Sequence, residues 1–268
     1  MLKYSIMGNT ESQRTVAVVH GIFGSGANWR GFVQKWAQLR PDLRMVLVDL
    51  RNHGTSDHYD EENTLMQCAW DILDLQDAIG AFQAIVGHSF GGKVALQCAV
   101  TPSNMDLEEV WALDSYPGML CKDSQDQSEV SSVVNTLRNV SMPLQKRSDL
   151  KNHLLQKGFS RMLSQWMTTN LIFKEDGYYW RFYLNGIEAL LQDYFAQDLW
   201  FVLEDPSLSV DAHLLRALQS DRWDEEAISR LENLPSRSSY HTLDAGHWVH
   251  VDDPDGVLRL LSEHVLPT

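Results

Sequence analysis

Several features that would point to particular classes of protein are scarce in this sequence. Only three cysteines occur in 268 residues, Cys68, Cys98 and Cys121, and their spacing fits neither a disulfide framework nor a metal site. We therefore expect buried free thiols in a reducing compartment. No apolar run reaches the ~18 residues of a membrane helix, and the first residues lack the apolar core of a signal peptide. The sequence predicts a soluble intracellular protein, in the cytoplasm or, after removal of a transit peptide, inside an organelle.

Basic residues are also scarce. Lysine and arginine together number 22, against 36 Asp and Glu, which gives a formal charge of −14 at pH 7. Nucleic acid and anionic membranes would be repelled by this charge, so we expect neither as a main partner. An anionic small molecule in a local pocket is still compatible with it.

What the sequence does contain is a regular alternation of strand and helix patterns in its first 114 residues. Strands buried on both faces are expected where continuous apolar runs occur, at 15–19, 44–50, 84–86 and 109–113. Helices are expected where apolar residues recur at helical spacing, at 29–37, 65–73 and 93–100. This alternation predicts an α/β fold with a mostly parallel central sheet flanked by helices.

The pattern changes from residue 115 onward. One hairpin with an Asp-Gly pair at its turn is expected at 172–180. Otherwise helical patterns dominate, at 149–157, 160–170 and 187–199. Strand and helix patterns then resume, at 213–218, 224–234, 239–243 and from about 256. We therefore expect residues 115–205 to form a helical cap inserted into a core made of 1–114 and 206–268.

The core is organised around the stretch Gly87-His88-Ser89-Phe90-Gly91. It lies between a strand pattern and a helix pattern, which is the context of a nucleophile elbow. The two glycines allow the chain to reverse tightly, and the following helix directs its N–H groups and positive dipole end at the reacting centre. Ser89 is therefore the predicted catalytic nucleophile.

A serine hydroxyl needs a base, and the base needs an acid that orients it. His247 is the predicted base, because its Gly-His loop follows the last strand pattern and reaches the sheet edge that carries the elbow. The tight turn would direct His88 away from the hydroxyl of Ser89. Two aspartates, Asp114 and Asp221, follow strand patterns at the same edge, and their positions alone do not decide between them.

Backbone N–H groups are expected to stabilise the oxyanion that forms on a carbonyl substrate. One should belong to Phe90, and the other to Ile22 in the glycine-rich loop that follows the first apolar strand pattern. The side chains of Phe23, His88 and Trp248 are candidates to line the substrate pocket. No metal ion and no other cofactor is expected.

Four motifs together resemble one branch of the α/β-hydrolase superfamily, that of the YbfF-type esterases and the α/β-hydrolase-domain-11-like proteins. They are His20–Ser25, Val48–Ser56, Gly87–Lys93 and Gly246–His250. Two further segments, 114–117 and 220–223, look closer still to plant members. The resemblance implies the α/β-hydrolase fold and a serine hydrolase that cleaves small-molecule carboxylic esters or thioesters without a cofactor. It also favours Asp114 as the acid, in an Asp-x-x-Pro turn like that of YbfF-type esterases, with Asp221 as the alternative.

Other functions remain compatible with the same residues. The triad could serve C–C bond hydrolysis or acyl transfer, because a fold does not fix a reaction. A small-molecule receptor that keeps the triad but hydrolyses slowly, or not at all, is a further alternative. The sequence does not determine the acyl chain length, the leaving group or whether the protein is a monomer or a dimer.

Overall fold

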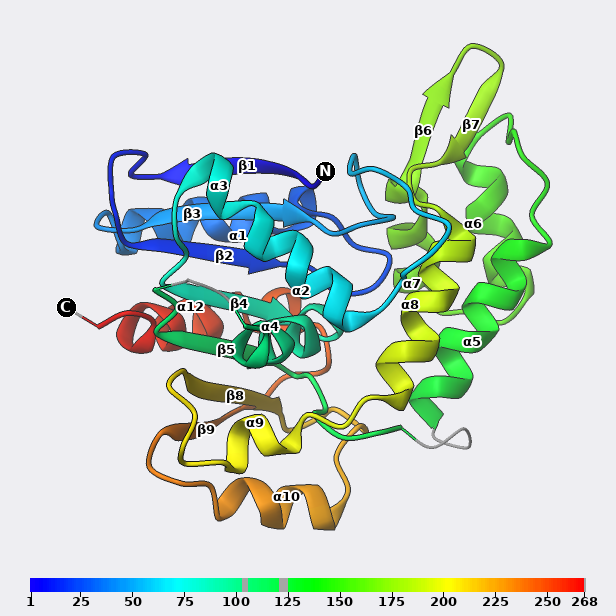
Figure 1. The fold of residues 1–268 in the computed structure, drawn as a ribbon. Coiled ribbons are helices and arrows are strands. Elements are labelled where there is room, and N and C mark those ends of the chain that lie inside the picture. The colour runs from blue at the N-terminus through cyan, green and yellow to red at the C-terminus, as the bar shows by residue number, and fades with distance from the viewer. Residues whose placement is uncertain (103–105, 121–124, 268) are drawn as a thin grey trace.

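A computed structural model describes residues 1–102, 106–120 and 125–267, with the backbone alone for 125–129. A seven-stranded sheet forms its centre, in the order β1-β3-β2-β4-β5-β8-β9 (Figure 1). The strands are Lys3–Gly8 (β1), Thr15–Val19 (β2), Arg44–Asp49 (β3), Ala84–His88 (β4), Glu109–Leu113 (β5), Asp211–Ala217 (β8) and Ser238–Leu243 (β9). Every neighbouring pair is parallel except β1 with β3. The predicted mostly parallel α/β sheet is confirmed.

Strand β1 is the one sheet strand that the sequence patterns do not predict. It pairs antiparallel with β3, from Lys3 opposite Asp49 to Gly8 opposite Arg44. Its side chains alternate between exposed and half-buried, because it lies at the edge of the sheet. Such a strand lacks the continuous apolar run by which the buried strands are recognised.

Helices cover both faces of the sheet (Figure 1). Apolar side chains alternate along each strand: Val16 and Val18 pack in one core layer, and Ala17 and Val19 in the other. The first layer is completed by α1 (Gly26–Leu39), α11 (Val249–Asp252) and α12 (Pro254–His264). The second is completed by α2 (Leu65–Asp74), α3 (Gln76–Ile79), α4 (Phe90–Val100), α9 (Trp200–Glu204) and α10 (Glu225–Glu232).

Two helices begin at the capping residues that their sequences favour. The hydroxyl of Thr64 accepts a hydrogen bond from the Gln67 N–H at 3.1 Å and caps α2. The carboxylate of Asp253 accepts from the Gly256 N–H at 2.9 Å and caps α12, with Pro254 in the first turn. Both caps satisfy N–H groups that a helix start leaves without a partner.

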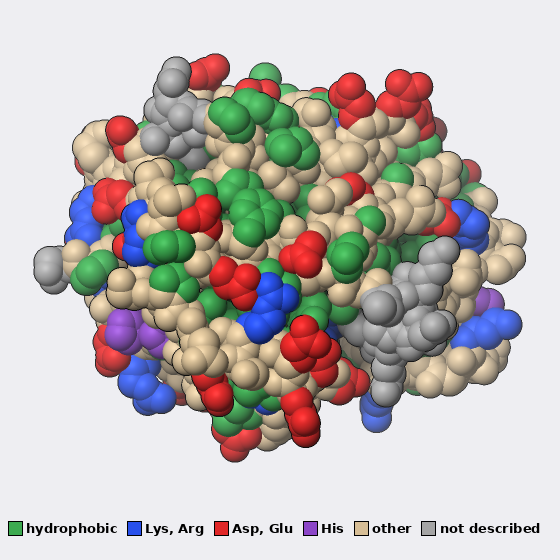
Figure 2. Space-filling view, turned by 60° about the horizontal axis from the view of Figure 1, so that its bottom comes forward, with side chains coloured by type: hydrophobic (Ala, Val, Ile, Leu, Met, Phe, Trp, Pro, Cys, Tyr) green, Lys and Arg blue, Asp and Glu red, His purple; other side chains and the backbone are tan. Residues whose placement is uncertain are grey.

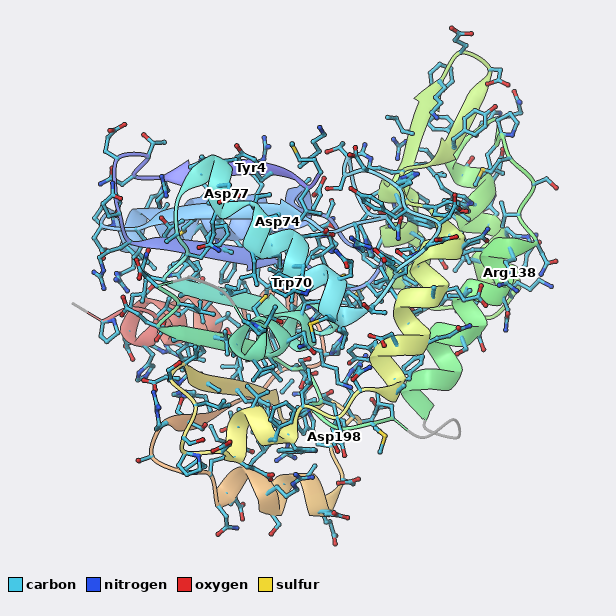
Figure 3. All side chains as sticks on the ribbon, viewed as in Figure 1. Tyr4, Trp70, Asp74, Asp77, Arg138 and Asp198 are labelled. Atoms are coloured by element: carbon cyan, nitrogen blue, oxygen red, sulfur yellow. The ribbon has the colours of Figure 1, made fainter. Side chains whose placement is uncertain are left out.

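Helices α5 to α8 and a small hairpin lie together beyond the carboxyl ends of the parallel strands (Figure 1). We call this part, residues 125–196, the cap lobe. Its elements are α5 (Gln125–Arg138), α6 (Arg147–Gln156), α7 (Arg161–Met167), the 3-10 turn η1 (Thr168–Asn170), β6 (Leu171–Lys174), β7 (Gly177–Trp180) and α8 (Leu184–Ala196). An ion pair between Arg138, labelled in Figure 3, and Glu188 joins α5 to α8. The insertion boundaries at 115 and 205 stay a prediction, since α9, inside that range, packs against α4 and β8.

Helix α8 of the cap lobe rests on the loop that follows β3. The carbonyl oxygen of Asn52 accepts from the Tyr183 N–H at 2.9 Å, just before α8 begins. The Leu65 N–H donates to the Asp193 carboxylate at 2.7 Å. A Cβ on Gly186 would lie 2.2 Å from Nδ2 of Asn52, so a larger residue would displace this buried amide. Backbone and side-chain bonds therefore fix the cap lobe to the core near the site described below.

The structure describes two of the three cysteines, which the sequence predicts to be buried free thiols. Cys68 on α2 and Cys98 on α4 are buried and free, as predicted. Burial raises the pKa of both thiols, so they stay protonated and unreactive near neutral pH. Cys121 lies outside the described residues.

The surface carries charge of both signs without a single basic patch on the face shown in Figure 2. Acidic side chains are scattered over this face, with basic ones between them. This distribution agrees with the net charge of −14. In the described part of the chain no helix is long and apolar enough to cross a membrane.

Candidate active site

Ser89 occupies a strained turn between β4 and α4. Its φ of 53° and ψ of −118° are rare for a residue with a side chain. The turn depends on neighbouring glycines, because a Cβ on Gly87 would lie 1.9 Å from the carbonyl oxygen of Gly91. The hydroxyl of Ser115 donates to the Ser89 carbonyl oxygen at 2.6 Å and helps to hold the strained backbone. This is the geometry of a nucleophile elbow.

The imidazole of His247 is bonded to a buried carboxylate. Its Nδ1 lies 2.7 Å from Oδ2 of Asp114, a side chain with no exposed surface. The other oxygen, Oδ1, accepts from the Ala217 N–H at 3.0 Å and from Nε1 of Trp223 at 2.8 Å. Because an ionised carboxylate can only accept, Nδ1 of His247 carries a proton, and in the neutral ring Nε2 holds the lone pair.

The environment of Asp114 keeps this carboxylate ionised. Burial alone would raise the pKa of Asp114. The hydrogen bond and charge of His247 and the N–H donors of Trp223 and Ala217 outweigh burial, so the pKa lies below its ordinary value. A permanent negative charge therefore faces the ring of His247.

The alternative acid, Asp221, is exposed in the turn after β8. Trp223, two residues further on, is buried, and its indole N–H reaches Asp114. The hydrogen bond of the His247 ring to Asp114 favours Asp114 over Asp221 as the acid.

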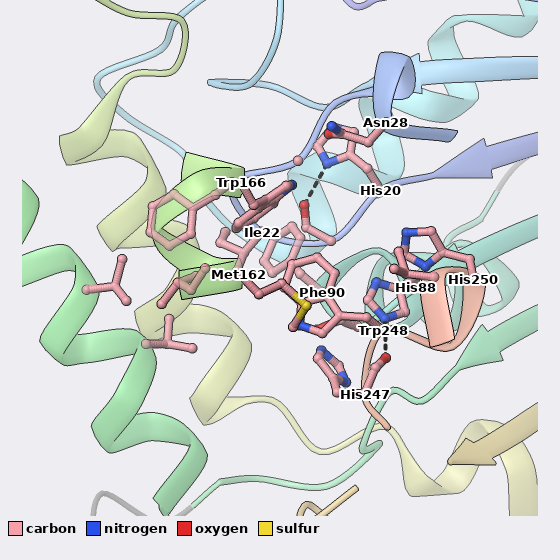
Figure 4. Close-up of a pocket in the computed structure, with 18 of the residues that line it drawn as sticks. His20, Ile22, Asn28, His88, Phe90, Met162, Trp166, His247, Trp248 and His250 are labelled. Carbon is pink, nitrogen blue, oxygen red and sulfur yellow. Dashed lines mark hydrogen bonds between the residues drawn. The ribbon is translucent and has the colours of Figure 1, made fainter. Parts of the chain in front are cut away.

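His88 holds the loop of His247 in place. Its Nε2 donates to the carbonyl oxygen of His247 at 2.8 Å (Figure 4). The two rings are 4.7 Å apart between centroids, and the ring of His250 lies 5.0 Å from that of His88. Burial, and next the neighbouring His247 and His250, lower the pKa of His88 well below its ordinary value. A neutral His88 adds no positive charge beside the imidazole of His247.

The loop that carries Ile22 is held by one buried and one partly buried polar contact. Nε2 of His20 accepts from the Leu50 N–H at 3.0 Å. Asp49 accepts through Oδ1 from the Gly26 N–H at 2.7 Å, at the start of α1. Burial lowers the pKa of His20, which keeps the ring neutral and able to accept. These bonds anchor the loop on both sides of Ile22.

A cavity of about 410 Å³ lies between the elbow, the loop of His247, the loop of Ile22 and the cap lobe (Figure 4). Its wall includes the predicted nucleophile, base, oxyanion-hole and pocket residues, namely Ile22, Phe23, His88, Ser89, Phe90, His247 and Trp248. The cap lobe supplies a largely apolar wall: Val130, Val133, Met162, Leu163, Trp166, Leu191, Tyr194 and Phe195. Among residues 1–102, 106–120 and 125–267, no group of three or more His, Cys, Asp or Glu side chains is arranged to hold a metal ion.

Comparison with known proteins shows the family to which the chain belongs. The sequence matches the alpha/beta hydrolase family over residues 16–260. The chain belongs to that family. It is similar to the sn-1-specific diacylglycerol lipase ABHD11 of Danio rerio, 26% identical over 94% of this chain and 78% of the relative. It is also similar to esterase YbfF of Escherichia coli (strain K12), 24% identical over 96% of this chain and 95% of the relative.

Solved structures agree on the fold of this α/β hydrolase. A marine microorganism esterase superposes with a TM-score of 0.83 over 98% of both chains, at 23% identity. A thioesterase domain from the curacin biosynthetic pathway gives a TM-score of 0.69 over 97% of this chain and 94% of that chain, at 18% identity. The predicted fold and branch are confirmed, and the names of the relatives support a carboxylesterase-like hydrolase. The closer resemblance to plant members stays a prediction.

Sequence reasoning missed two buried polar contacts close to the site of this α/β hydrolase. Trp223 belongs to the segment 220–223 that resembles plant members, yet nothing local shows that its N–H would reach Asp114, 109 residues away. Lys93 follows the elbow glycines and is fully buried, although helical spacing marks it only as part of a helix. Both depend on contacts between elements that are distant in the sequence.

Proposed function

We propose that the protein is a serine hydrolase that cleaves carboxylic esters through an acyl-enzyme, with Ser89 as nucleophile, His247 as base and Asp114 as the acid that orients it. The observation that carries the proposal is the 2.7 Å bond between His247 and the buried Asp114, with His247 and the strained Ser89 on the wall of one cavity. Relatives named as an esterase and as a lipase support the same chemistry.

In the first half of the reaction, the Oγ atom of Ser89 attacks the carbonyl carbon of the ester. Nε2 of His247 takes the hydroxyl proton, and the carboxylate of Asp114 stabilises the imidazolium that forms. The N–H groups of Ile22 and Phe90 donate to the oxyanion, and Phe90 has the advantage of the positive end of α4. When the C–O bond to the leaving alcohol breaks, His247 returns the proton to the alcohol oxygen.

In the second half, water hydrolyses the acyl-enzyme. His247, neutral again, takes a proton from the water as its oxygen attacks the acyl carbon. The same two N–H groups hold the second oxyanion. Breaking the bond to Ser89 and returning the proton to its Oγ releases the carboxylic acid and restores the enzyme.

The cavity suggests an ester with an apolar acyl group. Its volume lies within the roughly 300–1,000 Å³ typical of small-molecule sites. Aromatic and aliphatic side chains of the cap lobe form much of its wall, where burial of an apolar acyl chain would be favourable. Thioesters would meet the same residues, so ester and thioester substrates are compared in the test.

The test combines labelling with turnover. The wild-type protein should react with a fluorophosphonate at Ser89, one label per chain, and hydrolyse p-nitrophenyl butyrate. Ser89→Ala should lose both properties while its thermal unfolding stays close to that of the wild type. Tight ligand binding without labelling or turnover would favour a receptor and contradict the proposal. Ester formation from an added alcohol, faster than hydrolysis, would favour acyl transfer instead.

A further inference from the structure

A lysine is fully buried in the core one helical turn after Ser89. Lys93 on α4 has no exposed surface. Its ammonium group donates to three backbone carbonyl oxygens, those of Gly118 at 2.7 Å, Tyr194 at 2.8 Å and Gln197 at 2.8 Å. An ammonium group has three N–H donors, so these acceptors satisfy all of them.

The three carbonyls belong to the two connections between the core and the cap lobe. Gly118 lies on the chain that leaves β5 toward the cap lobe, and Tyr194 and Gln197 lie where α8 ends and the chain returns (Figure 1). The connections are also bonded to each other, from the Leu120 N–H to the Phe195 oxygen at 3.0 Å. Lys93 thus ties both connections to the helix that carries the elbow. Its charge also suits the C-terminal end of α8, where helix carbonyls lack partners.

Placing a cation here is unfavourable by itself. Burial lowers the pKa of Lys93 to about 7, and the negative charges of Asp198 and Asp193 oppose that shift. Asp198 lies on the segment between α8 and α9, where Figure 3 labels it. The ring of Tyr194 adds a favourable contact, with its centroid 4.5 Å from Nζ. An apolar side chain would fill the space without this desolvation, so the cation is explained by the three carbonyls that it holds together.

The residues held by Lys93 form part of the cavity wall. Tyr194 and Phe195 both line the cavity, and the ring of Tyr194 lies 5.6 Å from that of Phe90, the residue after the nucleophile. A shift of the end of α8 would therefore move the wall opposite Ser89. The elbow itself would not move, because its backbone is held by β5 and Ser115.

We propose that Lys93 is a positioning residue of the substrate site, which fixes the two cap connections and thereby sets the wall that contacts the acyl chain. The kinetic readout rests on the proposed ester hydrolysis. Without Lys93, these three buried or partly buried carbonyls would lose this donor, and the end of α8 would move relative to α4. Long acyl chains, which reach the cap wall, would then bind less well, while short ones would react as before.

The test compares Lys93→Met with Gln97→Met. Gln97 is one turn further along α4, is also buried, and its amide lies near Thr101 and Met66 and not near the cap connections. Lys93→Met should raise KM for p-nitrophenyl octanoate about tenfold or more, while kcat and KM for the acetate change by less than about threefold. Gln97→Met should leave the ratio of octanoate to acetate efficiency unchanged. An unchanged ratio in Lys93→Met, or an equal loss for both esters, would overturn the proposal.

Two further measurements keep the proposal testable if Lys93→Met folds poorly or if the wild type hydrolyses no ester. Lys93→Arg keeps the charge, but a planar guanidinium cannot meet three convergent carbonyls in the same way. Lys93→Arg should also lower the ratio of octanoate to acetate efficiency. A ratio equal to that of the wild type would count against the proposal. Amide hydrogen exchange in 115–120 and 194–199 should be faster in either Lys93 variant than in the wild type. Exchange at the wild-type rate in both Lys93 variants would refute the proposal. Faster exchange in the variants, together with a wild type that hydrolyses no ester, would refute only the proposed function.

Discussion

Replacing Asp114 by asparagine should change the tautomer of His247 without changing the size of the buried side chain. The asparagine Oδ1 can keep the bonds from the Ala217 N–H and the Trp223 indole N–H, at 3.0 Å and 2.8 Å in the native protein. Its NH₂ group then faces Nδ1 of His247, where the native carboxylate accepts at 2.7 Å. Since an NH₂ group can only donate, Nδ1 must become the acceptor, and the ring proton moves to Nε2. A protonated Nε2 cannot take the proton of Ser89.

The expected loss is large because the base is disabled while its position is kept. The corresponding change in a Ser-His-Asp protease lowers kcat about 10⁴-fold. For Asp114→Asn we therefore expect kcat for p-nitrophenyl butyrate to fall about 10⁴-fold, or about 5 kcal/mol of transition-state stabilisation. KM should change little, because Asp114 does not line the cavity.

The matched control is Asp221→Asn, which neutralises the exposed aspartate that the sequence leaves as the alternative acid. It should keep turnover and thermal unfolding close to those of the wild type. Loss of turnover in a folded Asp221→Asn protein, together with an active Asp114→Asn protein, would show that Asp221 is the acid.

Three further substitutions test the hydrogen bond to Asp114, the glycine of the elbow and the histidine beside Trp29. Trp223→Phe removes one hydrogen bond to the buried Asp114 carboxylate, so the free energy of unfolding should fall by about 1.5–3 kcal/mol in urea unfolding; an unchanged free energy of unfolding would show that this donor does not stabilise the carboxylate. Gly87→Ala places a Cβ 1.9 Å from the carbonyl oxygen of Gly91, so thermal unfolding should show a severely destabilised chain, and native stability with normal labelling would contradict the elbow geometry. Burial lowers the pKa of His250 from 6.5 to about 4. As the pH falls, the imidazole of this residue is therefore protonated in the unfolded chain before it is protonated in the folded protein. The free energy of unfolding then decreases as the pH falls from about 6.5 toward 4. Between pH 7 and pH 5, urea unfolding should show a loss about 2 kcal/mol larger for the wild type than for His250→Phe, which keeps a ring beside Trp29, and equal losses would contradict this.

The parts of the fold that the sequence predicts are those with a strong local signal. The strands that lead to Ser89 and Asp114 are buried on both faces and carry continuous apolar runs. The elbow is also local, because its glycines are needed within a few residues of the serine. His247 could be predicted from the rule that loops after parallel strands meet at one edge of the sheet.

The parts that sequence reasoning misses depend on contacts between distant segments. Strand β1 lies at an edge and is half-exposed, so its pairing with β3 leaves little trace in the pattern. The bond from Trp223 to Asp114 spans 109 residues, and the bond from Lys93 to Tyr194 spans 101. The choice of Asp114 over Asp221 likewise depends on which carboxylate faces His247, which position along the chain does not reveal.

Trapping the covalent acyl-enzyme on Ser89 tests the proposed hydrolysis most directly. The protein is mixed with an excess of p-nitrophenyl butyrate, quenched in acid within milliseconds to seconds, and analysed by mass spectrometry of the intact chain and of its peptides. We predict a population heavier by one butyryl group, with the modification on the peptide that contains Ser89, and no such population in Ser89→Ala. Turnover of the ester by Ser89→Ala at the wild-type rate, or a butyryl group found on another residue that turns over at the rate of hydrolysis, would contradict the account.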